Sequence, residues 1–117
     1  AFANSYGGLI LLGVEERPDH SLRVQGLLEP HEMAKEFWRM VSDPQVVSVN
    51  ILRPEDVWVA GTDDGAVLVI QVPPGERDQL PVYLGQDPFH GSYRRSGDGD
   101  YHCTRAEVQA MLGARTH

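Results

Sequence analysis

Residues 1–16 read AFANSYGGLILLGVEE. In this stretch a helix end made of small residues is followed by an apolar strand and then by two glutamates. Ala1 to Asn4 predict the last turn of a helix, which Gly7 or Gly8 can close by taking a positive φ. Residues 9–13 offer no polar face, so they predict a strand that is covered on both sides and lies in the middle of the sheet. Since the helix turn opens at the first residue, we expect the chain to be a piece of a longer protein.

The composition predicts one domain over residues 1–117, with 41% apolar residues and a single hydrophobic core. The chain carries 17 acidic and 10 basic residues, a formal charge of -7. This excess repels polyanions at long range, so any contact with nucleic acid requires a local basic patch.

Cys103 is the only cysteine, which excludes an intramolecular disulfide and a thiolate-rich zinc site. No run of about 18 apolar residues and no basic segment before an apolar core occurs, so the sequence shows neither a membrane span nor a signal peptide. We expect a cytoplasmic protein that makes no contact with a membrane.

The remaining pattern predicts an α+β fold with a mixed, largely antiparallel sheet of about five to six strands and two to three helices. Alternating residues 22–27 predict a hairpin with the first strand, and Pro30 opens a helix whose apolar stripe includes Phe37. Thr104 and Glu107 have the spacing of a capping box, which predicts a final helix. Further strands are predicted at residues 46–52, 57–60 and 66–72.

The order of several short motifs resembles the Schlafen-type AlbA-like domain family. The first motif is Ala-Phe-Ala-Asn-x-x-Gly-Gly, which here contains Asn4, Gly7 and Gly8. Val-Pro-Pro at residues 72–74, Pro-Val-Tyr at 81–83 and Tyr-x-Arg-x-Gly at 93–97 follow in the family order. The resemblance implies a nucleic-acid-binding module of a bacterial-type transcriptional regulator, in which other domains of the parent chain are partners.

The Tyr-x-Arg-x-Gly element supplies the candidate binding residues for DNA or RNA, because arginine forks bind phosphate oxygens. Adjacent side chains on a strand project to opposite faces, so one arginine is expected to pair internally and the other to meet phosphate. An alternative is that Arg95, the position of the family arginine, pairs with Asp98 or Asp100. Tyrosine rings, those of Tyr93 and Tyr101, can stack on unpaired bases. The candidate residues are Tyr93, Arg94, Arg95, Ser96 and Gly97, together with Arg77 in the loop after Pro74.

Two other functions compete with this interpretation. In a metal-dependent ribonuclease, Glu15 and Glu16 would hold Mg or Mn, but the resemblance implies two further acids from an earlier strand that this chain does not contain. The histidines lack metal-site spacing, and no hydrolase or phosphate-loop motif occurs, so we expect no cofactor and no enzymatic activity from this chain by itself. The second competing function is a structural or dimerisation module, a homodimer formed through exposed sheet edges.

Overall fold

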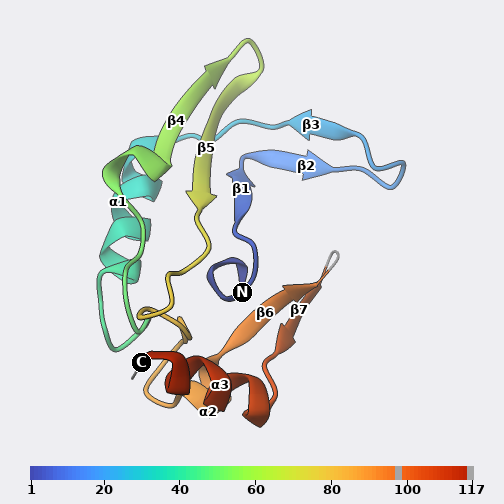
Figure 1. Cartoon of the computed structure of the whole chain (residues 1–117). Coiled ribbons are helices and arrows are strands. Elements are labelled where there is room, and N and C mark those ends of the chain that lie inside the picture. Colours follow the sequence, from blue (N-terminus) through green and yellow to red (C-terminus); the bar gives the residue numbers. More distant parts are fainter. Residues whose placement is uncertain (97–98, 116–117) are drawn as a thin grey trace.

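Antiparallel strands and three α-helices make up the described part of the computed structural model, residues 1–96 and 99–115 (Figure 1). This arrangement confirms the predicted α+β class. The elements in chain order are η1 (Phe2–Asn4), β1 (Gly8–Leu12), β2 (Val14–Glu16), β3 (Leu22–Val24), α1 (Pro30–Val41), η2 (Pro54–Asp56), β4 (Val57–Thr62), β5 (Gly65–Val72), α2 (Pro88–Gly91), β6 (Tyr93–Ser96), β7 (Gly99–His102) and α3 (Arg105–Arg115).

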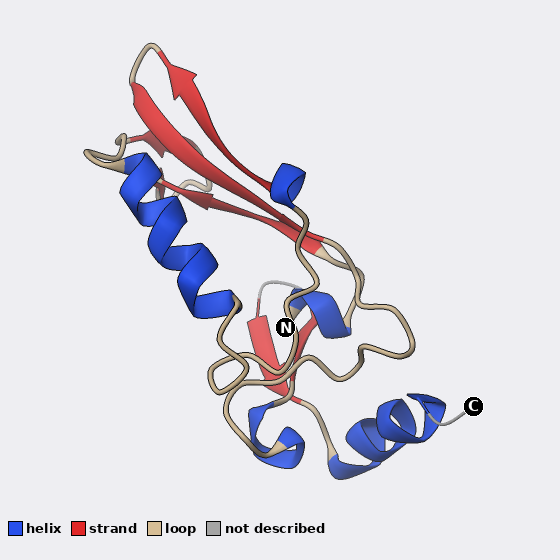
Figure 2. Cartoon of the chain, turned by 90° about the vertical axis from the view of Figure 1, so that its left-hand side faces the viewer, coloured by secondary structure: helices blue, strands red, loops and turns tan. Residues whose placement is uncertain are grey.

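The largest sheet has the order β1-β5-β4, with both pairings antiparallel. β5 lies in the centre, and its residues Leu68 and Ile70 are among the most buried of the chain. β4 and β5 confirm the strands predicted at residues 57–60 and 66–72, and a tight turn joins them, with Thr62 opposite Gly65. α1 lies along one face of this sheet (Figure 2). The buried side chains of this sheet therefore lie on β5, whereas no residue of α1 is itself buried.

β1 is an edge strand, so the prediction that it lies in the middle of the sheet is wrong. Ile10 points to the α1 face, whereas Leu9 and Leu11 point to the other face and are 55% and 37% exposed. An apolar run indicates that both faces of a strand are buried. The run itself does not identify the elements that would cover those faces. No described strand pairs with the second edge of β1.

The remaining strands form two separate two-stranded sheets, β2-β3 and β6-β7, instead of extending the first one. Leu22 to Val24 form a hairpin with Val14 to Glu16 of β2. The predicted hairpin of residues 22–27 with the first strand is therefore wrong in its partner, since β1 pairs with β5. The described residues thus contain seven strands in three sheets, where the sequence predicted about five to six strands.

Residues 46–52 do not form the predicted strand. They contact residues 83–85 through a bridge between Val47 and Leu84. Hydrogen bonds from the Ser48 N–H to the Tyr83 carbonyl, from the Gly85 N–H to the Val46 carbonyl and from the Tyr83 N–H to Oγ of Ser48 accompany this bridge. The side chain of Asn50 accepts the N–H of Leu52 at 3.0 Å, which bends the backbone locally. The branched side chains of this segment instead line a cavity of about 460 Å³ between α1 and the sheet.

Both longer helices match the sequence pattern. α1 begins at Pro30, as predicted, and ends at Val41. At the start of α3, Thr104 Oγ1 accepts the N–H of Glu107 at 3.2 Å, and Glu107 Oε1 accepts the N–H of Thr104 at 2.9 Å, which confirms the capping box. At its end, Arg115 donates to the carbonyls of Gln79, Leu80 and Pro81. Among the described helices, none combines the length and the apolarity that crossing a membrane requires.

The predicted helix end at the N-terminus is a 3₁₀ helix, η1, closed by the Gly7 N–H donating to the Phe2 carbonyl at 2.9 Å. Gly7 has a φ of +80°, and a Cβ there would lie 2.6 Å from the Val72 carbonyl oxygen. A Cβ on Gly8 would lie 2.5 Å from the ring of Phe2. Both glycines are therefore required by close packing, and Gly7 also by its backbone conformation.

Candidate nucleic-acid interface

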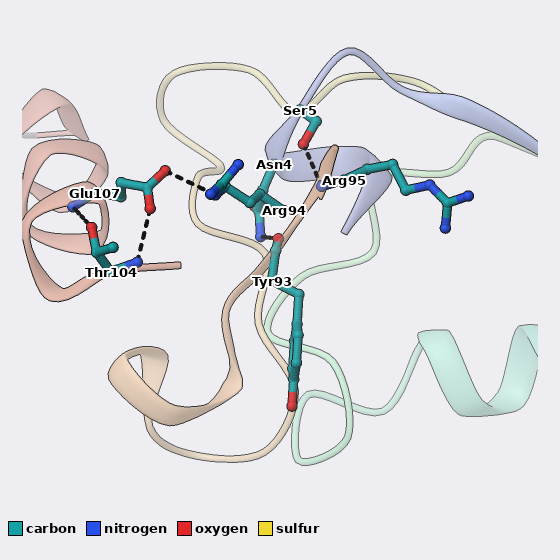
Figure 3. A network of polar contacts seen from close by, with 7 residues as sticks. All are labelled: Asn4, Ser5, Tyr93, Arg94, Arg95, Thr104 and Glu107. Carbon is teal, nitrogen blue, oxygen red and sulfur yellow. Dashed lines mark hydrogen bonds and ion pairs between the residues drawn. The ribbon is translucent and has the colours of Figure 1, made fainter. Parts of the chain in front are cut away.

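The hairpin β6-β7 contains most of the candidate nucleic-acid-binding residues predicted from the sequence. Arg94 lies opposite Tyr101, and Arg95 lies opposite Asp100. Residues opposite each other share a face of a hairpin, and successive residues alternate. Arg94 and Arg95 therefore point away from each other, as predicted and as Figure 3 shows.

Arg94 lies between an aromatic ring and a carboxylate. Its Nε is 3.4 Å from Oε2 of Glu107, in a geometry that makes an ion pair without a hydrogen bond (Figure 3). Its guanidinium carbon is 5.8 Å from the centre of the Tyr101 ring, within the range of a cation–π contact. Both members of the ion pair are 41% exposed, so water screens their attraction.

Arg95 pairs with Asp100, which agrees with the alternative weighed for it. Its Nη1 lies 3.4 Å from Oδ1 of Asp100, and its guanidinium carbon lies 5.3 Å from the centre of the Phe2 ring. The backbone N–H of Arg95 donates to Oγ of Ser5 at 2.8 Å. Asp98, the other carboxylate considered, lies outside the described residues.

Asn4 fixes the hairpin to the start of the chain. Its Nδ2 donates to the carbonyl of Tyr93 at 2.6 Å and to that of Val82 at 2.9 Å, and its Oδ1 accepts the N–H of Val82 at 2.8 Å. The motif asparagine thus satisfies three backbone groups from two distant segments. Its function is structural, and it holds β6 in place beside η1 (Figure 3).

Glu107 links the hairpin to α3. The N–H of Thr104 that its carboxylate accepts lowers the pKa of Glu107, with a further contribution from the Thr104 hydroxyl and from Arg94. The same carboxylate therefore caps α3 and balances the charge of Arg94. The sequence predicted the cap but not the ion pair, since nothing in a helix-start motif indicates a partner on a strand.

The other nominated residues lie in different surroundings. Tyr93 packs on His102 with ring centres 4.3 Å apart and lines the apolar cavity, so Tyr101, at 52% exposure, is the more accessible ring. Arg77 is exposed in the loop after β5 and makes no ion pair with the described residues. Ser96 ends β6, and Gly97 lies outside the described residues.

Glu15 and Glu16 are adjacent in β2, so their side chains project to opposite faces. Oε2 of Glu15 accepts a hydrogen bond from Gln25 at 2.9 Å, and Oε1 of Glu16 is 3.5 Å from Nδ1 of His20. Within residues 1–96 and 99–115, no three acidic, histidine or cysteine side chains gather in a way that could hold a metal ion. The two glutamates are thus not brought together by this fold.

These features define an α+β module whose N-terminal turn is bonded to an arginine-bearing hairpin. The family model described as Schlafen, AlbA_2 matches residues 1–104. The chain therefore belongs to the Schlafen AlbA_2 family, in agreement with the resemblance of its motifs.

A solved structure supports the same fold. The N-terminal domain of an ATP-dependent DNA helicase RecG-related protein from Nitrosomonas europaea is similar to this chain, with 27% sequence identity and a TM-score of 0.59. The similarity covers 89% of this chain and 71% of that domain. No curated protein matches the chain significantly.

Proposed function

We propose that this chain is a nucleic-acid-binding module of a bacterial-type transcriptional regulator, and that it binds through the hairpin β6-β7 without catalysing a reaction. One observation carries the proposal: Arg94 and the half-exposed ring of Tyr101 share one face of the hairpin, 5.8 Å apart. The guanidinium group of an arginine can donate two hydrogen bonds to a phosphate, and a neighbouring aromatic ring can stack on an unpaired base. Arg77, exposed and without an ion pair among the described residues, is a candidate for a second phosphate contact.

The family and the similar structure support this class of ligand. The chain belongs to the Schlafen AlbA_2 family, and the similar solved domain is part of a protein named for its relation to a DNA helicase. Both favour nucleic acid over a peptide or a small metabolite as the partner.

The ion pairs of the two arginines do not prevent binding. Each has its charged atoms 3.4 Å apart, and the four side chains are between 31% and 55% exposed. Exposed ion pairs contribute about 0–1 kcal/mol, so a phosphate can replace the carboxylate at little cost. Because the chain has a charge of -7, its affinity should be modest. Because arginine–phosphate contacts release counterions, the affinity should fall as salt rises.

Fluorescence anisotropy tests the proposal with labelled single-stranded DNA, double-stranded DNA and a folded RNA, at low and moderate salt. We expect salt-sensitive binding that the double variant Arg94→Ala, Arg95→Ala loses. The matched control is Lys35→Ala, Arg39→Ala, which removes the same charge from the exposed side of α1 and should keep most of the affinity. Equal losses in both double variants would indicate bulk charge, and no binding of any probe at low salt would overturn the proposal.

A further inference from the structure

The ring of Tyr101 lies along the surface of the hairpin β6-β7. Gly99 precedes it by two positions on β7, so the two residues share a face of the strand. A Cβ on Gly99 would lie 3.1 Å from the Tyr101 hydroxyl oxygen and 3.2 Å from two of its ring carbons. The end of the ring therefore lies over the glycine, where no side chain occupies the space. The ring is 52% exposed, and its open surface is turned away from the strand.

A guanidinium group borders this ring. Arg94 lies opposite Tyr101 in the hairpin, its guanidinium carbon is 5.8 Å from the ring centre, and its side chain is 41% exposed. A nucleotide carries its base and its phosphate on one sugar, so a single nucleotide can place the base on the ring and the phosphate on the arginine. The base must be unpaired for this, because in a duplex both faces of a base are covered by its neighbours.

The two arginines of β6 project from opposite faces of the hairpin (Figure 3). Arg94 points toward Glu107 of α3, whereas Arg95 lies on the face that contacts Phe2. The hairpin is a two-stranded sheet of its own, and no other described strand widens it. A DNA duplex, with a persistence length of about 150 base pairs, is too stiff to pass around it and can meet only one face. A flexible single strand can bring successive phosphates to both arginines.

The net charge of the chain favours the same ligand. A single strand has a lower linear charge density than a duplex, so a chain of charge -7 repels it less at long range. Stacking of a base on an aromatic ring does not depend on charge, so it contributes to the affinity despite this repulsion.

We propose that the hairpin β6-β7 selects single-stranded nucleic acid, with an unpaired base stacked on Tyr101 and phosphates of the same strand bound by Arg94 and Arg95. This inference rests on the proposed function and narrows its ligand to unpaired segments. Gly99 is a positioning residue, because it lets the ring lie along the hairpin. Neither stacking nor phosphate binding involves a sugar hydroxyl, so single strands of DNA and RNA should bind with similar affinity.

Fluorescence anisotropy at one low salt concentration tests the selectivity. The probes are a labelled DNA strand, the duplex of that strand with its complement, and an RNA strand of the same sequence. Both single strands should bind at least about fivefold more tightly than the duplex. Tyr101→Leu should weaken single-strand binding at least about fivefold and change duplex binding little, whereas Tyr101→Phe keeps the ring and the affinity.

The matched control is Trp58→Leu, which removes an aromatic ring of 42% exposure from β4 and should leave the affinity unchanged. Circular dichroism verifies that all variants are folded. Equal affinity for single strand and duplex would overturn this inference and leave the proposed function intact, and so would wild-type affinity of Tyr101→Leu for single strands. No binding of any probe would overturn the proposed function and this inference with it.

A stacking signal tests the position of the ring. A fluorescent purine analogue placed in the single strand is quenched when it stacks on an aromatic ring. Gly99→Val puts a branched side chain beneath the Tyr101 ring, so the quenching at saturating protein should decrease as it does in Tyr101→Leu. Wild-type quenching in Gly99→Val would exclude the positioning role of Gly99, and wild-type quenching in Tyr101→Leu would overturn stacking on this ring.

Discussion

Asn4 and Val82, 78 positions apart in the sequence, are joined by a reciprocal pair of hydrogen bonds: Nδ2 of Asn4 donates to the Val82 carbonyl at 2.9 Å, and Oδ1 accepts the Val82 N–H at 2.8 Å. The same Nδ2 also donates to the Tyr93 carbonyl. One side chain thus satisfies three backbone groups on two separate segments of the chain.

Replacing this asparagine should destabilise the fold. Asn4→Ala leaves one N–H and two carbonyl groups without their partner, so we expect a loss of about 3 kcal/mol in the free energy of unfolding. Urea denaturation measures it. Asn50→Ala is the control, since Asn50 is exposed and makes a local bond to Leu52; it should cost less than about 1 kcal/mol. Similar losses in both variants would contradict the structural function assigned to Asn4.

The glycines of the first motif should tolerate no side chain. In Gly7→Ala the positive φ alone costs about 1–3 kcal/mol, and the new methyl group also meets the Val72 carbonyl. In Gly8→Ala the methyl group must displace the Phe2 ring. Gly61→Ala in β4 is the matched control, because nothing lies within 4 Å of its Cβ position. Thermal unfolding should separate the two motif glycines from Gly61, and a Gly61 effect as large as theirs would be unexpected.

The cap of α3 should weaken in acid. Hydrogen bonds from Thr104 lower the pKa of Glu107 in the folded chain, so its ionised form contributes stability above the pKa that this glutamate has in the unfolded chain. That contribution is lost as the pH falls through the lower, folded pKa. We expect unfolding monitored at intervals from pH 6 to pH 3 to show a smaller loss of stability in Glu107→Gln, which keeps the cap geometry without titrating. Identical pH profiles would exclude this contribution.

Removing the carboxylate beside Arg95 should improve nucleic-acid binding if the proposed function is correct. Asp100→Asn deletes the charge 3.4 Å from the guanidinium, and an exposed pair worth about 0.5–1 kcal/mol corresponds to a two- to fivefold gain in affinity. Asp63→Asn, in the exposed β4-β5 turn, changes the net charge equally and should have a smaller effect. Anisotropy titrations of the two variants at one salt concentration give the comparison, and equal gains would refute a local effect of Asp100.

The single thiol should react slowly. Cys103 is 7% exposed, and burial, together with the nearby charge of Glu107, raises the pKa of its thiol. The thiolate is the reactive form, so the native chain at pH 8 should consume a chromogenic disulfide reagent much more slowly than the urea-unfolded chain. A native rate equal to the unfolded rate would indicate that this part of the fold opens readily.

Local patterns in the sequence predicted the elements that depend on local chemistry. Pro30 and the apolar stripe identified α1, and Thr104 with Glu107 identified the start of α3, because helix signals extend over only one or two turns. β4 and β5 match two strands that their branched side chains predicted, and the Asp64-Gly65 dipeptide between them is typical of a tight turn. The α+β class could be inferred from these elements together with the order of the family motifs.

Non-local relationships could not be predicted in this way. Residues 46–52 have the composition of a strand, yet they line a cavity, because strand pairing requires a neighbour that composition does not identify. For the same reason, the sequence did not predict that β1 lies at the edge of the sheet. At the candidate interface, alternation predicted the opposite directions of Arg94 and Arg95, but the contact of Arg95 with Phe2 joins residues from opposite ends of the chain.

The bonds of Arg115 to the carbonyls of residues 79–81 have a mechanical consequence when they are set beside those of Asn4 to Val82. Both ends of the described chain are thus tethered to neighbouring residues of one short segment, residues 79–82. A pulling force applied at the two ends would therefore converge on this segment before it reached the sheet. Its rupture force, measured by optical tweezers, would set the load at which the whole module begins to yield.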